Sequence, residues 1–189
     1  EVFMPSVKSI GNNFFDSNQI VRTLEIPLVE KIGDNFLENN GLINELYLPS
    51  TINIGSNFLK QNQMLEKLII PNVIELKSGT LQHNNNLKEL YAPRVVKIGN
   101  NVLELNNSLT EFESLYLEEV GDNFLKYNRW LEKFIAPNLR KIGLYILSSN
   151  NVLIDVDISS LIDEYKDNLS KYMKEMLKQE TPYTLKLKY

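Results

Sequence analysis

The residues that could carry out catalysis in this sequence are few and widely separated. His83 is the only histidine and there is no cysteine, which excludes clusters of imidazole or thiolate metal ligands and a cysteine nucleophile. General acid–base catalysis by His83 would need a partner group, and spacing assigns none. Because His83 lies in a polar run, residues 82–86, we expect a solvated loop residue rather than a catalytic base.

Two carboxylates near the C-terminus offer a second kind of chemistry. Asp155 and Asp157 alternate along the sequence, so a strand would place both on one face, where they could hold a weakly bound cation. The favoured interpretation is a solvated acidic edge. The sequence has no zinc-ligand spacing, no phosphate-binding glycine loop and no nucleophile elbow. We therefore predict a protein that is not an enzyme, with no catalytic residue, metal or cofactor.

Asparagine is the polar residue type that does recur, at a strict interval of 22 residues. Its amide can donate to and accept from backbone groups of its own coil and of the adjacent one. A row of such amides would satisfy backbone groups that burial leaves unpaired. We interpret this column as a structural ladder rather than a metal or sugar site. Its members are Asn18, Asn40, Asn62, Asn84, Asn106, Asn128 and Asn150.

Proline, glycine and apolar residues keep the same period. Leu115 is the one departure from the proline column, and Lys77 the one departure from the glycine column. The columns are Pro5, Pro27, Pro49, Pro71, Pro93 and Pro137; Gly11, Gly33, Gly55, Gly99, Gly121 and Gly143; and, among the apolar ones, Val21, Ile43, Leu65, Leu87, Leu109, Leu131 and Leu153. A fixed period of this length indicates a solenoid of stacked repeats.

One unit, residues 40–61, follows the pattern N-x-x-L-x-x-L-x-L-P-x-V-x-x-I-G-x-N-F-L-x-x. It resembles the bacterial leucine-rich repeats of the BspA-like (Treponema pallidum-type) class: residues 65–73 (LEKLIIPNV) match the first half of that class's pattern and residues 32–40 (IGDNFLENN) the second. Asparagine stands where the class usually has cysteine, and Phe-Leu where it has Ala-Phe. The resemblance covers residues 1–158, about seven units, and implies a leucine-rich-repeat solenoid.

Each half of the unit predicts its own local structure. The segment Leu46-Tyr47-Leu48 alternates inward and outward, which is typical of a strand, and Pro49 then ends it. Stacked units should join these strands in one parallel sheet. On the other face, we expect a second short extended segment at Val-x-x-Ile-Gly and a helical or 3-10 turn at Asn-Phe-Leu. The column glycines should need positive φ. At Lys77, with Gly79 close by, we expect a locally altered turn.

The period stops after Ile158, so residues 159–189 form a separate end piece. The apolar residues from Ser160 to Gln179 follow a helical stripe, as expected for an α-helix that caps the last coil. A helix that binds a partner or a membrane surface is the alternative. Residues 183–189 alternate like a strand with no assignable partner. No equivalent cap precedes Glu1, so we expect further repeats or a cap upstream of a truncated N-terminus.

The outward residues of the strands are the candidate binding surface. Tyr47, Ile69 and Tyr91 occupy one outward column in successive units, flanked by Glu45 and Glu89. An exposed aromatic-aliphatic patch often marks an interaction site, and the acids would attract a basic partner. The alternative is that these residues merely stabilise the sheet as cross-strand neighbours.

Net charge and family resemblance limit the possible functions. A formal net charge of -4 argues against a duplex-binding protein, and no apolar run is long enough to span a bilayer. The BspA-like resemblance implies a non-catalytic protein–protein interaction module, an adhesin on a bacterial surface or in the secreted fraction that engages host proteins. One alternative is the substrate-recognition domain of a larger secreted effector enzyme. Another is a structural array without a specific ligand.

Overall fold

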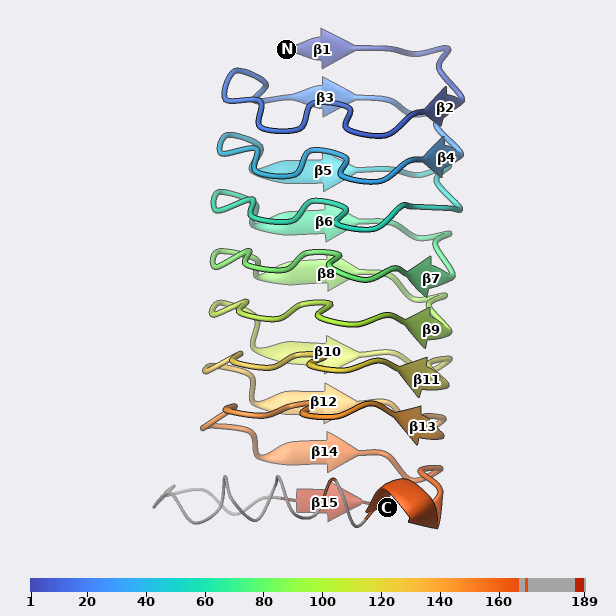
Figure 1. Cartoon of the computed structure of the whole chain (residues 1–189), viewed down its shortest axis with the longest axis vertical. Coiled ribbons are helices and arrows are strands. Elements are labelled where there is room, and N and C mark those ends of the chain that lie inside the picture. Colours follow the sequence, from blue (N-terminus) through green and yellow to red (C-terminus); the bar gives the residue numbers. More distant parts are fainter. Residues whose placement is uncertain (167–168, 170–185, 189) are drawn as a thin grey trace.

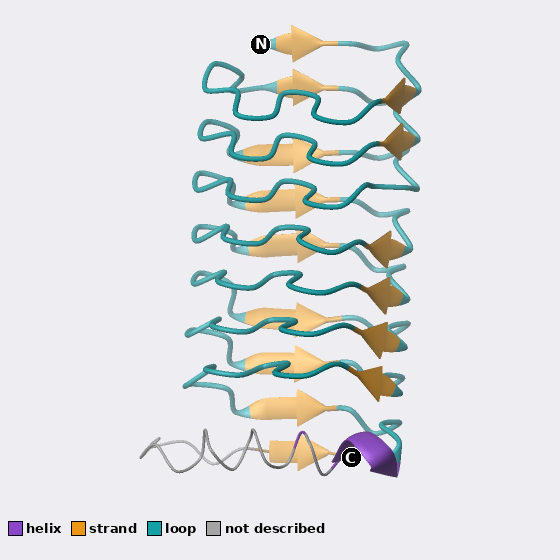
Figure 2. Ribbon diagram, in the orientation of Figure 1, coloured by secondary structure: helices purple, strands orange, loops and turns teal. Residues whose placement is uncertain are grey.

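The computed structural model describes residues 1–166, 169 and 186–188. The chain winds into a stack of coils, one repeat to a coil (Figure 1). Strands line one side of the stack, while the other side combines turns with shorter strands (Figure 2). We call the strand side the front face, although in Figures 1 and 2 it is the side farther from the viewer. The front strands are β1 (Val2–Phe3), β3 (Leu24–Glu25), β5 (Glu45–Tyr47), β6 (Lys67–Ile69), β8 (Glu89–Tyr91), β10 (Glu111–Glu113), β12 (Lys133–Ile135), β14 (Asp155–Asp157) and β15 (Lys186–Lys188).

The front strands form because inward and outward residues alternate, as expected. In β5 the side chain of Leu46 is buried, whereas Glu45 and Tyr47 are exposed. Paired strands are parallel, with each residue opposite its equivalent in the next repeat, for example Leu46 opposite Leu68. The predicted leucine-rich-repeat solenoid is therefore confirmed.

The front face is not the single continuous sheet expected. Its strands form three sheets, β1-β3, β5-β6-β8 and β10-β12-β14-β15. The spacing between neighbouring front strands is visibly wider at the two interruptions, between β3 and β5 and between β8 and β10 (Figure 1). In paired strands, Lys133 N donates to Thr110 O and Ile70 N to Tyr91 O. At the step from β8 to β10, the equivalent bonds would run from Glu111 N to Lys88 O and from Ala92 N to Glu113 O. Neither bond is present among the described residues.

The second extended segment of each coil is present on the back of the stack. Its strands are β2 (Ser9–Ile10), β4 (Lys31–Ile32), β7 (Glu75–Leu76), β9 (Lys97–Ile98), β11 (Glu119–Val120) and β13 (Lys141–Ile142). Strands β7, β9, β11 and β13 make one parallel sheet, β2 pairs with β4, and residue 53 adds an isolated bridge to Lys31. The two coils whose front strands β8 and β10 are unpaired are joined on the back by the pair β9–β11.

The expected positive φ at the column glycines is wrong. Among the described glycines, positive φ is found at Gly79 and not in the column. The column needs glycine because coils approach closely: a Cβ on Gly55 would lie 2.3 Å from the carbonyl carbon of Gly33. The turn after Lys77 keeps the hydrogen bond of its equivalents: Gly79 N donates to Asn100 O at 2.9 Å, as Asn57 N does to Ser78 O. The local alteration at Lys77 is in the pairing of the back strands, since β7 is not paired with the preceding coil. Among the described residues, Lys77 N also lacks the bond to the preceding coil that Gly99 N makes to Leu76 O.

The Asn-Phe-Leu segments are not the helical or 3-10 turns expected. Every second residue there has positive φ, as at Asn35 (57°), Leu37 (52°) and Asn39 (54°). This alternation sends amides toward neighbouring coils: Asn35 N donates to Ser56 O at 2.9 Å, and Leu37 N donates to Phe14 O at 3.0 Å. A helix would use these groups internally, so the Asn-Phe-Leu segments of adjacent coils would have no hydrogen bonds between them.

Most side chains of the asparagine column are buried and hydrogen-bonded to the backbone. The side chains of Asn40, Asn62, Asn84, Asn106 and Asn128 are fully buried. In Asn128, Nδ2 donates to Leu103 O of the preceding coil at 2.7 Å and to Lys126 O of its own coil at 3.2 Å. The two N-terminal members act differently: Asn18 Oδ1 accepts from the amides of Ile20 and Val21.

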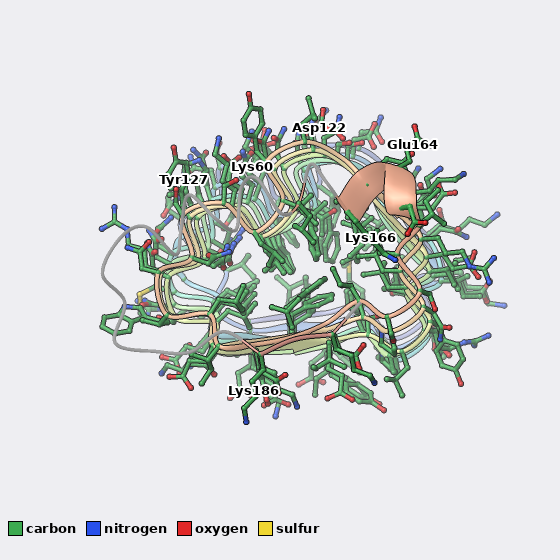
Figure 3. All side chains as sticks on the ribbon, turned by 90° about the horizontal axis from the view of Figure 1, so that it is seen from below. Lys60, Asp122, Tyr127, Glu164, Lys166 and Lys186 are labelled. Carbon is green, nitrogen blue, oxygen red and sulfur yellow. The ribbon has the colours of Figure 1, made fainter. Side chains whose placement is uncertain are left out.

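The core runs along the axis of the stack and continues into the end piece. A view along the axis shows side chains filling the inside of the coils, with Lys186 pointing outward from the front face and Tyr127 lying on the opposite side (Figure 3). Residues 163–166 and 169 are helical, and Leu161 and Leu169 are buried. The rest of the predicted helix, residues 167–168 and 170–179, lies outside the described residues. The predicted tail strand is β15, which extends the sheet beside β14.

Candidate binding surface

The predicted patch residues lie side by side on the front face. In the parallel register, Tyr47 is opposite Ile69 and Ile69 is opposite Tyr91. Tyr47 is 59% exposed and Tyr91 is 51% exposed, while Ile69 between them is half-buried. The three side chains are held by the sheet β5-β6-β8, which places them on a rigid surface. We call this set the tyrosine patch.

The flanking acids are partly neutralised by a lysine between them. Lys67 lies opposite both Glu45 and Glu89 in the register, and its Nζ is 2.7 Å from Glu89 Oε2. The hydrogen bond to Glu89 raises the pKa of Lys67 above its usual value; partial burial opposes this, and the charges of Glu89 and Glu45 add to it. The patch is therefore bordered by an alternating row of charges rather than by acids alone.

A groove lies at each interruption of the front sheet, one on either side of the tyrosine patch. The β3–β5 groove has a volume of about 410 Å³ and is lined by Tyr47 and Ile69 together with residues 23–27 of the preceding coil. The β8–β10 groove has a volume of about 360 Å³ and is lined by residues 88–93 and 111–116. Because Tyr47 lines one groove and Tyr91 the other, patch and grooves form one connected surface.

The β8–β10 groove brings in residues that sequence reasoning missed. Leu115 and Tyr116 are 50% and 63% exposed and join Tyr91 in its lining. Leu90 and Ala92 are half-buried, although the equivalent strand residue Leu68 is fully buried. The signal available in the sequence was Leu115 itself, the departure from the proline column in the coil that forms the groove wall.

The other sequence candidates lie away from this surface. His83 has φ of 61° in a turn, where its amide donates to Glu104 O and its carbonyl accepts from Gln63 Nε2. Asp157 is bound by Lys188 Nζ at 2.9 Å. Partial burial raises the pKa of Asp157, but hydrogen bonds from Lys188 and Ser159 outweigh it and leave the pKa below its usual value. Within the described residues, no group of three or more His, Asp or Glu side chains is placed to hold a metal ion.

A family model described as the BspA type leucine-rich repeat region matches residues 1–110 and 80–186, in six copies. The chain belongs to this family. No curated protein and no solved structure is a match to the chain.

Membership of the BspA-type family carries general expectations for this chain. Leucine-rich repeats commonly mediate protein–protein interaction, and their solenoids are typically non-catalytic scaffolds. BspA-type repeats are typically found on bacterial surface proteins. No helix among the described residues is long and apolar enough to cross a membrane.

Proposed function

We propose that this BspA-type array is a non-catalytic module that binds a protein through the front face. The tyrosine patch is the centre of the contact, with Glu45 and Glu89 at its border. The observation that supports this is the exposure of two tyrosines, one on either side of Ile69, on strands fixed by parallel pairing. Rigid aromatic side chains lose little conformational entropy on binding, which makes tyrosine effective at the centre of an interface.

The partner we propose is a host protein with a basic contact surface, met by an array that is secreted or held on a bacterial surface. The charged row beside the patch and the β8–β10 groove holds three acids, Glu45, Glu89 and Glu111, against Lys67. This excess of acids favours a basic partner because opposite charges speed encounter and disfavour acidic competitors. We base the bacterial location on the family, whose repeats are typically found on bacterial surface proteins. We base the host partner on that location.

The test is capture of partners from host-cell extract and extracellular matrix by the immobilised chain, with bound proteins identified by mass spectrometry. The Tyr47→Ala/Tyr91→Ala variant should lose the captured protein, because it removes both exposed rings of the patch. Trp130→Ala is the matched control: it removes a side chain that is 62% exposed in a turn outside the grooves. Capture that both variants retain equally would show that the contact lies elsewhere.

A further inference from the structure

The first residue of each front strand from β5 onward belongs to one row of charges. In the sequence of the coils it runs Glu45, Lys67, Glu89, Glu111, Lys133, Asp155, Lys186. Every paired step in this row joins opposite charges: Glu45 with Lys67, Lys67 with Glu89, Glu111 with Lys133, and onward to Lys186. The step from Glu89 to Glu111 joins two acids, and this is where the sheet is interrupted.

Charge repulsion opposes pairing at this step, whereas the β3–β5 interruption, where Thr23 precedes Glu45 in the same row, has no pair of like charges. Like charges on neighbouring strand positions destabilise a sheet, whereas opposite charges stabilise it. Pairing β8 with β10 as the other strands pair would bring the carboxylates of Glu89 and Glu111 side by side. The strands instead stay apart, and the β8–β10 groove opens between them, exposing part of Leu90 and Ala92.

The cations closest in sequence do not neutralise the groove. Lys67 is bound to Glu89, and Lys88 is bound to Glu66 of the preceding coil at 2.8 Å. Lys133 lies 3.5 Å from Glu113, so Glu111 has no ion pair among the residues that the structure describes. The groove therefore combines an unpaired carboxylate with an apolar lining that includes Tyr91, Leu115 and Tyr116.

We propose that the β8–β10 groove binds an arginine side chain of the protein partner. The guanidinium would lie between Glu89 and Glu111, restoring the alternation of charge along the row. A guanidinium pairs with carboxylates through two parallel hydrogen bonds and also stacks on aromatic rings, so it fits a groove that offers both Glu111 and Tyr91. Its methylene stem would cover the apolar floor at Leu90 and Ala92. This inference rests on the proposed function in that it assigns part of the partner's chemistry to one position on the front face.

The test uses hexa-arginine as the probe and hexa-citrulline as its uncharged analogue, with binding to the full chain measured by fluorescence anisotropy. Glu111→Lys should weaken hexa-arginine binding at least tenfold, because the new ammonium occupies the place of the ligand's charge. Glu111→Gln, which keeps the shape and removes the charge, should also weaken it. Glu30→Lys makes the same change of charge at an exposed position outside both grooves, and should change the affinity less than threefold.

An independent readout follows the sheet itself. In Glu111→Gln the repulsion between positions 89 and 111 is removed without a ligand and without placing a second cation beside Lys133, so the amides at positions 92 and 111 should become protected from hydrogen exchange as β8 and β10 pair. Equal weakening by the Glu30 and Glu111 substitutions would overturn the proposal, as would equal binding of hexa-citrulline.

The proposed function and the proposed arginine site can be tested independently of each other. Tyr47 does not line the β8–β10 groove, so Tyr47→Ala should reduce partner capture and leave hexa-arginine binding unchanged. If capture depends on the tyrosines while hexa-arginine does not bind, the arginine site is wrong and the proposed function stands. If hexa-arginine binding depends on Glu111 while capture ignores the tyrosines, the groove stands and the proposed contact centre is wrong.

Discussion

Asn128 illustrates how a single buried amide joins two coils of the stack. Its Nδ2 donates to Leu103 O and to Lys126 O, while its Oδ1 has no hydrogen-bond partner. The contribution of this side chain to stability therefore comes from its donor atom. The choice of asparagine at this position is set by Leu103 O, which would otherwise be buried without a donor, since Lys126 O also accepts from Leu105 N.

Asn128→Ala should lower the free energy of unfolding by about 1–3 kcal/mol, because it removes the donor to Leu103 O, whereas Lys126 O still accepts from Leu105 N. Asn128→Asp should cost more, since a carboxylate would point acceptors at two carbonyl oxygens. Urea denaturation followed by circular dichroism measures both. Asn86→Ala is the control: Asn86 is exposed and its Nδ2 donates one bond, to Gln63 O. A loss as large at residue 86 as at residue 128 would contradict the role given to burial.

At the scale of elements, periodicity determined what the sequence could predict. The strand at Leu46 and the ladder at Asn128 were predictable because each depends on a residue type repeated in every coil. The turn at Leu37 was not, because nothing in an Asn-Phe-Leu sequence signals positive φ at a leucine. The patch at Tyr47 and Tyr91 could be placed from the outward column, whereas the β8–β10 groove depends on where strands fail to pair. Besides Leu115, the acids Glu89 and Glu111 at equivalent positions of successive coils were its signal in the sequence.

The spacing between coils depends on glycines where the back strands end. Gly55→Ala would place a Cβ 2.3 Å from the carbonyl carbon of Gly33 and 2.4 Å from the backbone nitrogen of Asp34. Because backbone atoms cannot move aside as a flexible side chain can, we expect a loss of about 1–3 kcal/mol in the free energy of unfolding. Thermal and urea denaturation measure this loss.

Gly11→Ala is the internal control for the same column. A Cβ at Gly11 meets no atom within 4 Å, and its φ is not positive. This substitution should leave stability within about 0.5 kcal/mol of the parent or slightly raise it, because alanine restricts the unfolded chain. Equal losses at residues 11 and 55 would indicate that glycine is needed for its backbone conformation rather than for the close approach of coils.

At the scale of the whole molecule, the question is whether an interrupted front face divides the stack into separate folding units. Across the step between β8 and β10, the back strands β9 and β11 remain paired. The turns continue as well, with Leu105 N bound to Lys126 O at 2.9 Å and Leu125 N bound to Val102 O at 3.2 Å. The core also passes through this step without a gap in its buried residues, from Val102 to Phe112 and Phe124. These contacts couple the coils on either side.

We therefore expect the described coils to unfold as one cooperative unit, as nearest-neighbour coupling predicts for a short repeat array. Native-state hydrogen exchange in increasing urea tests this at two amides on opposite sides of the interruption. Ile70 N donates to Tyr91 O at 2.9 Å, and Ala136 N donates to Asp157 O at 2.8 Å. Their opening free energies should converge on one value as urea rises, while the amides of Ala92 and Glu111 exchange rapidly throughout. If the two opening free energies stay different as urea rises, the β8–β10 step separates two folding units. The groove would then be a hinge between these units rather than a fixed site on a rigid face.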